Sequence, residues 1–109
     1  MATGRLGTAN ITTTDNTTVY TVPGTTFAVV TVNVVNRSSS AAALIKIAVS
    51  TSATPGLAEY IEYESSLVAN GVLERTGIVM KTGELIVIST PTASPALSVV
   101  VMGIETSTA

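Results

Sequence analysis

The stretch of sequence that decides the fold is Phe27–Asn36, which runs FAVVTVNVVN. Apolar and mixed positions alternate along it with the two-residue period of a β-strand. Its density of β-branched residues disfavours a helix, because side chains branched at Cβ lose rotamer freedom there. We therefore expect a strand with one uniformly apolar face and one mixed face. The two faces are Ala28, Val30, Val32 and Val34 against Val29, Thr31, Asn33 and Val35.

Shorter segments of similar character lie on both sides of this strand. Turn pairs such as Pro23-Gly24 and Asn70-Gly71 separate them, since proline presets φ and glycine accepts positive φ. About eight short strands with turns between them predict an all-β fold, a single antiparallel β-sandwich or jelly roll. The other expected strands are Ile11–Thr14, Thr17–Val22, Leu44–Ser50, Ala58–Glu64, Val72–Met80, Leu85–Ser89 and Leu97–Glu105.

Two segments of the chain differ in their expected order. Residues 1–10 contain two glycines and no clear periodicity, so we expect a flexible N-terminal arm that a partner would have to hold. Residues 11–109 are expected to form the single sandwich domain. Within it, Leu44–Ser50 should turn Ile45, Ile47 and Val49 inward, leaving Lys46 and Ala48 outward.

Composition limits the possible functions. Hydrophobic residues make up 46% of the 109 residues and charged residues only 11%, with a net charge of −2 and no Cys, His or Trp. Thiolate chemistry, Cys/His zinc sites and histidine general bases are thereby excluded. The five basic residues are scattered, so neither a nucleic-acid footprint nor a basic membrane-binding segment is expected. A surface this poor in charge favours an assembly in which much of it is covered.

The acidic residues Glu59, Glu62 and Glu64 are the best candidates for chemistry, and they are weak ones. Strict alternation would place Glu62 and Glu64 about 7 Å apart on one strand face. A glycosidase needs two carboxylates opposed across a sugar bond, and Ca²⁺ needs six to eight oxygens. A solvated or partner-contacting strand face is the favoured interpretation. We expect no catalytic residue, metal site or cofactor, with a glycan-processing or metal-dependent enzyme kept as a remote alternative.

The aromatic and basic residues nearby indicate contacts rather than catalysis. Alternation would place Tyr60 with Glu62 and Glu64, and would turn Tyr63 to the opposite face, so the two rings would not form one platform. Glu74 and Arg75 are adjacent and would also point apart. Arg75 is a candidate interface residue because its guanidinium carries a rigid set of five donors, with a simple solvent-exposed charge as the favoured interpretation.

Five blocks of this sequence resemble a set of small virion proteins from tailed bacteriophages, mainly phages of cyanobacteria and marine bacteria. The resemblance covers nearly the whole chain, and its two longest blocks are the most specific. The blocks are Gly4–Gly7 (GRLG), Tyr20–Pro23 (YTVP), Val32–Arg37 (VNVVNR), Glu59–Glu64 (EYIEYE) and Asn70–Gly77 (NGVLERTG).

The resemblance implies a non-enzymatic structural component of the particle, found in the virion after assembly in the host cytoplasm. The leading expectation is a capsid decoration (cement) protein that binds the major capsid protein, as a homo-oligomer with a trimer favoured. The alternative is a module associated with the tail or a fibre, in contact with host glycans. The expected assembly-interface residues are Arg5, Leu6, Tyr60, Glu62, Glu64 and Arg75.

Overall fold

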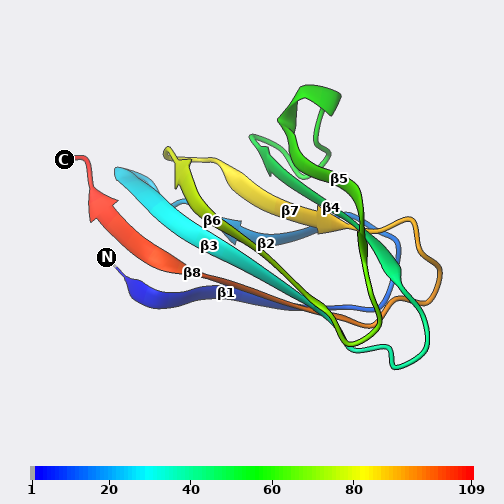
Figure 1. Ribbon diagram of the computed structural model, residues 1–109. Helices are drawn as coiled ribbons and strands as arrows, with labels where there is room; N and C mark the ends of the chain where they lie inside the picture. The colour runs from blue at the N-terminus through cyan, green and yellow to red at the C-terminus, as the bar shows by residue number, and fades with distance from the viewer. Residues whose placement is uncertain (1) are drawn as a thin grey trace.

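The structure, a computed structural model that describes residues 2–109, is built from eight β-strands and one short 3-10 turn (Figure 1). Seven of the eight expected strands have a counterpart whose boundaries differ by a few residues. The strand expected at Ile11–Thr14 is wrong: only Ile11 is in a strand, and residues 12–14 lie in the bend before Thr17, where Thr13 and Asp15 hydrogen-bond to each other. The elements are β1 (Thr3–Ile11), β2 (Thr17–Thr21), β3 (Thr26–Asn36), β4 (Ala43–Ser50), η1 (Leu57–Glu59), β5 (Tyr60–Leu67), β6 (Val72–Met80), β7 (Leu85–Ser89) and β8 (Leu97–Ser107).

The strands form two four-stranded antiparallel sheets that face each other. One sheet has the order β1-β8-β3-β6 and is called sheet A below; the other, sheet B, has the order β2-β7-β4-β5. Every connection crosses from one sheet to the other except the link from β4 to β5, which pair as neighbours. This order is that of an eight-stranded jelly roll, a double sheet made of two Greek keys. The prediction of an all-β antiparallel sandwich is confirmed.

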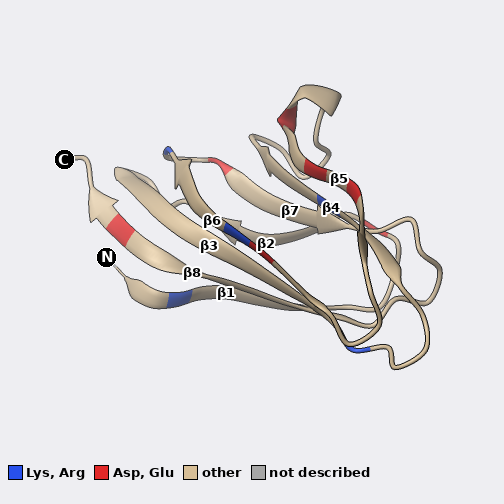
Figure 2. Ribbon diagram, viewed as in Figure 1, with Lys and Arg blue, Asp and Glu red and all other residues tan. Residues whose placement is uncertain are grey.

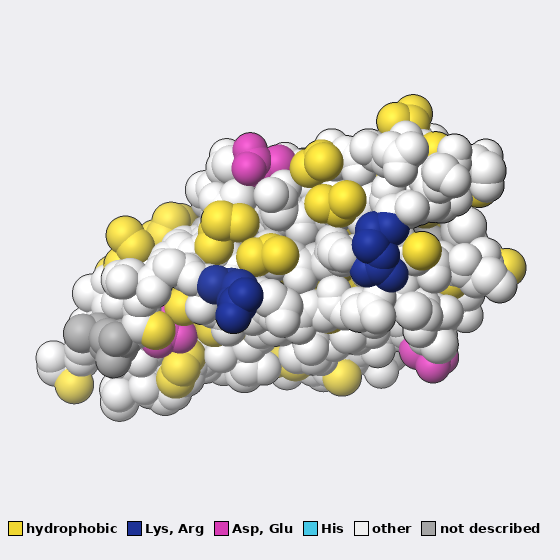
Figure 3. All heavy atoms as spheres, turned by 90° about the horizontal axis from the view of Figure 1, so that it is seen from below, with side chains coloured by type: hydrophobic (Ala, Val, Ile, Leu, Met, Phe, Trp, Pro, Cys, Tyr) yellow, Lys and Arg dark blue, Asp and Glu magenta, His cyan; other side chains and the backbone are white. Residues whose placement is uncertain are grey.

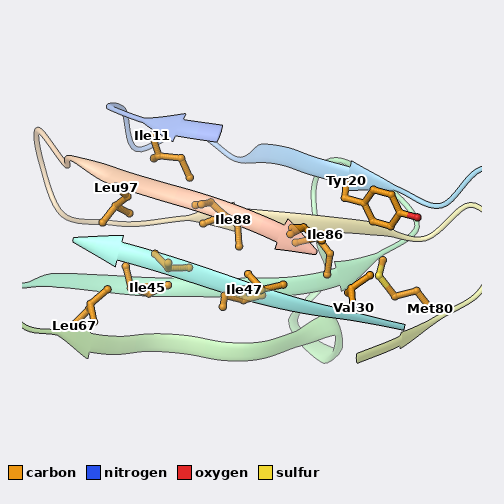
Figure 4. Packing of buried hydrophobic residues seen from close by; sticks show 14 of the residues in the cluster. Ile11, Tyr20, Val30, Ile45, Ile47, Leu67, Met80, Ile86, Ile88 and Leu97 are labelled. Carbon is orange, nitrogen blue, oxygen red and sulfur yellow. The ribbon is translucent and has the colours of Figure 1, made fainter. Parts of the chain in front are cut away.

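The interior lies between the two sheets, and β3 supplies its centre. Ala28, Val30, Val32 and Val34 are all 1% exposed or less, so the face predicted from Phe27–Asn36 is the buried one. Facing them are isoleucines from β4 and β7, among them Ile45, Ile47, Ile86 and Ile88 (Figure 4). Such a core stabilises the fold by roughly 25 cal/mol per Å² of apolar surface removed from water.

The expectation of a flexible arm over residues 1–10 is wrong for the residues that the structure describes, Met1 lying outside them. Residues Thr3–Ile11 form β1, which pairs with β8 from Thr3 opposite Ile104 to Ile11 opposite Leu97. The pairing is non-local, because it joins segments almost a full chain length apart. Polar, glycine-containing sequence still forms a strand here because β8 offers an unpaired edge for its backbone hydrogen bonds.

A hydrogen bond between side chains connects β2 of sheet B to β8 of sheet A. The hydroxyl of Tyr20 on β2 donates a hydrogen bond of 2.6 Å to Glu105 on β8. Burial and the neighbouring carboxylate both raise the pKa of Tyr20, so the phenol stays protonated and keeps donating. The same Glu105 side chain accepts a hydrogen bond from the backbone N–H of Ala2 at 3.2 Å. The start of β1 is thereby anchored to the last strand.

Gly103 on β8 lies directly against the backbone of β3. A Cβ added at this position would lie 2.1 Å from the carbonyl oxygen of Val29 and 2.8 Å from the Cα of Val30. Both atoms belong to the backbone, so neither can rotate away, and overpacking of this kind costs about 2 kcal/mol. We expect Gly103→Ala to lower the urea-unfolding free energy by that amount. Gly24→Ala is the control because its added Cβ would meet nothing within 4 Å, and equal stability of the two variants would contradict the prediction.

Candidate functional site

Four of the residues expected at an interface lie along one edge of the sandwich. Strand β5 is the edge of sheet B and β6 is the edge of sheet A, and these edges are neighbours in space. Figure 2 shows acidic residues along β5 and a basic residue on β6 beside them. Tyr60, Glu62 and Glu64 come from β5 and Arg75 comes from β6. We call this region the β5–β6 edge.

The β5–β6 edge owes its arrangement to two bulges in β5. Between the pairs Ile45–Ser65 and Ile47–Glu62, the single residue Lys46 faces two residues of β5. These are Tyr63 and Glu64, and the bulge is accompanied by a positive φ of 57° at Glu64. A second extra residue, Ile61, lies between the next two pairs. Each bulge reverses the alternation of side chains along the strand.

The expectation that Tyr60 and Tyr63 point to opposite faces is wrong because of these bulges. The ring centroids are 5.0 Å apart, with the planes inclined by 77° in an edge-to-face contact. The ammonium of Lys46 lies 4.9 Å above the centre of the Tyr63 ring and 3.8 Å from a carboxylate oxygen of Glu64. Lys46, Tyr60, Tyr63 and Glu64 therefore form one group on the outside of sheet B, called the outer cluster below.

Glu62 takes the opposite direction, so the expectation that it shares a face with Glu64 is also wrong. Its pairing with Ile47, a core residue, turns Glu62 toward the space between the sheets. Arg75 pairs with the buried Val32 and is turned toward the same space from sheet A. The two side chains form an ion pair, and Arg75 also donates to the carbonyl of Ile61 at 3.2 Å. Arg75 thus finds its partner on another strand and joins the two sheet edges.

The pKa of Glu62 is lowered, first by the hydrogen bond from the Ser65 hydroxyl and then by the hydrogen bond and positive charge of Arg75, with burial opposing both. Glu59 has a lowered pKa for another reason. It accepts hydrogen bonds from the backbone N–H of Gly56 at 2.7 Å and from the Ser50 hydroxyl at 2.9 Å. Both carboxylates are held ionised by structural contacts, which is the opposite of the raised pKa that a general acid requires.

The lowered pKa of Glu62 predicts a pH dependence of stability. The stabilising contribution is complete above the carboxyl pKa of the unfolded chain and is lost as the pH falls through the lower folded value. We expect Glu62→Gln to reduce the unfolding free energy by about 1 kcal/mol at pH 7, and by much less at pH 3. Urea unfolding at both pH values measures this, with Asp15→Asn in an exposed loop as the control. An equal deficit at pH 3 and pH 7 would rule out the ion pair as its source.

The remaining two expected interface residues, Arg5 and Leu6, lie on β1 at the far edge of sheet A. The register between β1 and β8 shifts at Arg5/Gly7, so that Leu6 is an extra residue and packs against the core. Arg5 is exposed and pairs with Met102 on the outside of sheet A. The structure therefore does not bring these two residues to the β5–β6 edge.

Lys46 and Tyr63 belong to the site and were missed from the sequence. The only available signal was the run of six residues Glu59–Glu64, in which two tyrosines and three acids crowd one short strand. Nothing in that run marks a bulge, since the residue at positive φ is a glutamate and not a glycine. The strand therefore contains no glycine that would have indicated a bulge from the sequence.

Three further features of residues 2–109 complete the description of the candidate sites. Among residues 2–109, no three His, Cys, Asp or Glu side chains come together in a group able to hold a metal ion. A small pocket between the 36–43 and 92–96 loops is surrounded by alanine, serine, threonine, asparagine and proline, without a carboxylate. Within the same residues, no helix has the length and apolar character needed to cross a membrane.

Comparisons with protein-family models, with curated proteins and with solved structures find no match to this chain. Its fold follows from the strand order described above, and its site from the contacts within the chain.

Proposed function

We propose that this chain is a non-enzymatic structural protein of a bacteriophage virion, a capsid decoration protein that binds the assembled lattice of the major capsid protein. One observation carries the proposal. The two sequence blocks most specific to the phage proteins, Glu59–Glu64 and Asn70–Gly77, are separated by residues 65–69 and belong to different sheets, and they meet at the β5–β6 edge through Glu62 and Arg75. A shared sequence pattern concentrated on one surface favours a shared contact.

The chemistry of this edge suits a partner surface better than a substrate. The Glu62–Arg75 pair is satisfied within the chain and rigidifies the edge. The outer cluster beside it presents Tyr63, which is 54% exposed, with a cation and an anion at its rim. Tyrosine is among the residues that most often dominate binding at protein interfaces, particularly when its ring is fixed by its neighbours.

The mechanism would be mass action. A protein that binds the assembled lattice and not the free subunits stabilises the assembled state in proportion to its occupancy. Low surface charge fits this role, because charges covered by a partner lose their hydration. The 11% of charged residues, against roughly 25% in ordinary soluble domains, is thus consistent with extensive contact in the particle.

The first test is binding of the purified chain to heads that lack it, measured by co-sedimentation. We expect Tyr63→Ala to weaken binding at least tenfold, since removal of an interface anchor commonly costs more than 1.4 kcal/mol. Val68→Ala is the matched control, because Val68 is 65% exposed and lies outside the outer cluster. Unchanged binding of Tyr63→Ala would remove the β5–β6 edge from the proposal.

The second test addresses the role itself. On heating, particles assembled without the chain should lose integrity at a lower temperature than complete particles do. On dilution of the salt, they should lose integrity while the ionic strength is still higher. Addition of the purified chain should restore resistance to heat and to low salt. Particles that withstand heat and low salt equally well without it would contradict a decoration role.

A module of the tail or a fibre that contacts host glycans is the second candidate. The observation that favours it is the placement of Tyr60 and Tyr63 on one surface, next to Lys46 and Glu64. An aromatic face with polar groups at its rim suits a sugar ring, which has both an apolar side and hydroxyls. Immunogold labelling of whole particles separates the candidates: gold confined to tails supports this module, and gold spread over heads supports decoration.

A further inference from the structure

The outside of sheet A is apolar over much of its area. Val29 on β3 pairs with Ile104 on β8 and with Val79 on β6, so three large side chains stand side by side across three strands. They are 41%, 55% and 69% exposed, in that order. Figure 3 shows hydrophobic side chains, in yellow, gathered over this side of the molecule. The apolar face, as it is called below, consists of Phe27, Val29, Val79, Val100, Met102 and Ile104.

Two opposite charges without a partner stand at opposite margins of the apolar face. A third charge, Arg37, lies at one end of the outside of sheet A and donates to Ser98 and Asn10. Arg5 lies on edge strand β1 and pairs with Met102, which in turn pairs with Thr31 of β3. Glu74 lies on edge strand β6 and pairs with Asn33 of β3. Among the residues the structure describes, neither Arg5 nor Glu74 takes part in an ion pair or a side-chain hydrogen bond. They are about 14 Å apart across the sheet, three strand spacings, so they do not reach each other within one molecule.

We propose that the apolar face is covered by the same face of a second copy of this chain, related by a twofold axis that lies in the interface and runs parallel to the strands. Such an axis exchanges the two edges of the sheet. It places β1 over β6 of the partner subunit and β8 over the partner's β3, so that Val29 meets Ile104 of the partner subunit. The contact is isologous, which means that each favourable pair occurs twice.

The same axis brings the two marginal charges together. Arg5 comes over β6 of the partner subunit, one row of side chains from Glu74. The offset along the strand equals the two residues from Thr31 to Asn33, about 7 Å, which an arginine side chain spans. The margins of the apolar face are therefore complementary in charge between the two copies, at Arg5 and Glu74. The resulting Arg–carboxylate pairs favour this alignment of the two copies over alignments shifted along the strands.

The size of the face is sufficient for a stable dimer. Four strands at a spacing of about 4.8 Å give a width of roughly 19 Å, and strands of this length at about 3.3 Å per residue extend for roughly 30 Å. Two such faces bury roughly 1,200 Å² in projection, the lower end of the range for specific protein interfaces. The aligned packing of two sheets at about 30° is the same arrangement that builds sandwich interiors.

This dimer does not rest on the proposed capsid role, because it uses the outside of sheet A, whereas Tyr63, the residue tested for binding to heads, lies on the outside of sheet B. A trimer of the kind implied by the resemblance would have to form through other surfaces. The experiment is the solution mass of the purified chain by light scattering after size exclusion at concentrations of tens of micromolar. We expect 22.2 kDa, twice the chain mass of 11.1 kDa. A mass of one or of three chains would overturn the proposal.

A charge exchange tests the register. Arg5→Glu places like charges against each other at two positions and is expected to weaken the dimer about tenfold or more, with the effect decreasing at high salt. Glu74→Arg should do the same, and the double exchange should restore dimerisation. Rescue requires that the two residues meet between copies, since they do not meet within one. Two weak single variants without rescue would overturn the twofold arrangement.

Val29→Glu tests the apolar centre of the contact. The side chain is exposed in the single chain, so the fold should be kept, which circular dichroism and a cooperative melt verify. We expect a monomer at concentrations where the wild type is dimeric. Leu57→Glu is the matched control, because Leu57 is 84% exposed on the η1 turn away from sheet A and its variant should remain a dimer. A dimeric Val29→Glu variant would contradict the proposed interface.

Discussion

Replacement of Asn36 by alanine should lower the free energy of unfolding by about 4 kcal/mol. Asn36 is 1% exposed at the end of β3. Its amide nitrogen donates to the carbonyls of Ala41, Leu67 and Val68 at 2.9, 3.2 and 3.3 Å, and its amide oxygen accepts the N–H of Ser38 at 3.1 Å. Each buried backbone group left without a partner costs about 1–3 kcal/mol, and this side chain serves several at once.

The measurement is urea denaturation followed by circular dichroism, with a decrease of roughly 15 °C expected in a parallel thermal melt. Asn33→Ala is a matched control on the same strand. The side-chain oxygen of Asn33 is buried and has no hydrogen-bond partner among residues 2–109, so its removal should be neutral or slightly stabilising. Similar losses for the two variants would mean that the amide contacts of Asn36 do not carry its effect.

Ile47→Ala is expected to cost about 3 kcal/mol and Ile47→Val about 1 kcal/mol. Ile47 is fully buried on β4, with neighbours β7 and β5 on its two sides and β3 across the core. The larger deletion leaves a cavity that neighbouring strands, held by their ladders of hydrogen bonds, do not fill. Equilibrium unfolding in urea gives both values.

Leu57→Ala provides the reference for the same class of change without a cavity. Its side chain is 84% exposed, so we expect a change within about 0.5 kcal/mol. Losses for Ile47→Ala no larger than for Leu57→Ala would show that the core between the sheets is loosely packed. A graded series from valine to alanine at position 47 would instead indicate close packing.

The candidate site shows where sequence reasoning reaches its limit. Choosing Tyr60, Glu62, Glu64 and Arg75 as residues of interest depended on residue type, and the structure does place all of them along one edge. The predicted directions of their side chains assumed strict alternation along the strand. The two bulges of β5 interrupt this alternation, so those directions were wrong. A bulge arises from the fit between neighbouring strands, so the local pattern of Glu59–Glu64 carries no sign of it.

The first strand shows the same limit for the fold. Thr3–Ile11 contains two glycines and a polar majority, with too little apolar pattern to identify a strand. Its order comes from β8, which pairs with it along almost its entire length, and from the contact of Ala2 with Glu105. The stabilising groups belong to the other end of the chain, and no window centred on residues 1–10 contains them.

The sequence by itself determined the fold class, the buried face of β3 and most of the turns, because alternation and turn chemistry act over a few neighbouring residues. Only the tertiary structure decided the order of the strands, the pairing of Arg75 with Glu62 and the meeting of Tyr60 with Tyr63. It also decided that Val29, predicted on the mixed face of β3, would join residues of β6 and β8 in a single apolar face. These features depend on which strands become neighbours, and that choice is made by burial and backbone pairing across the whole chain.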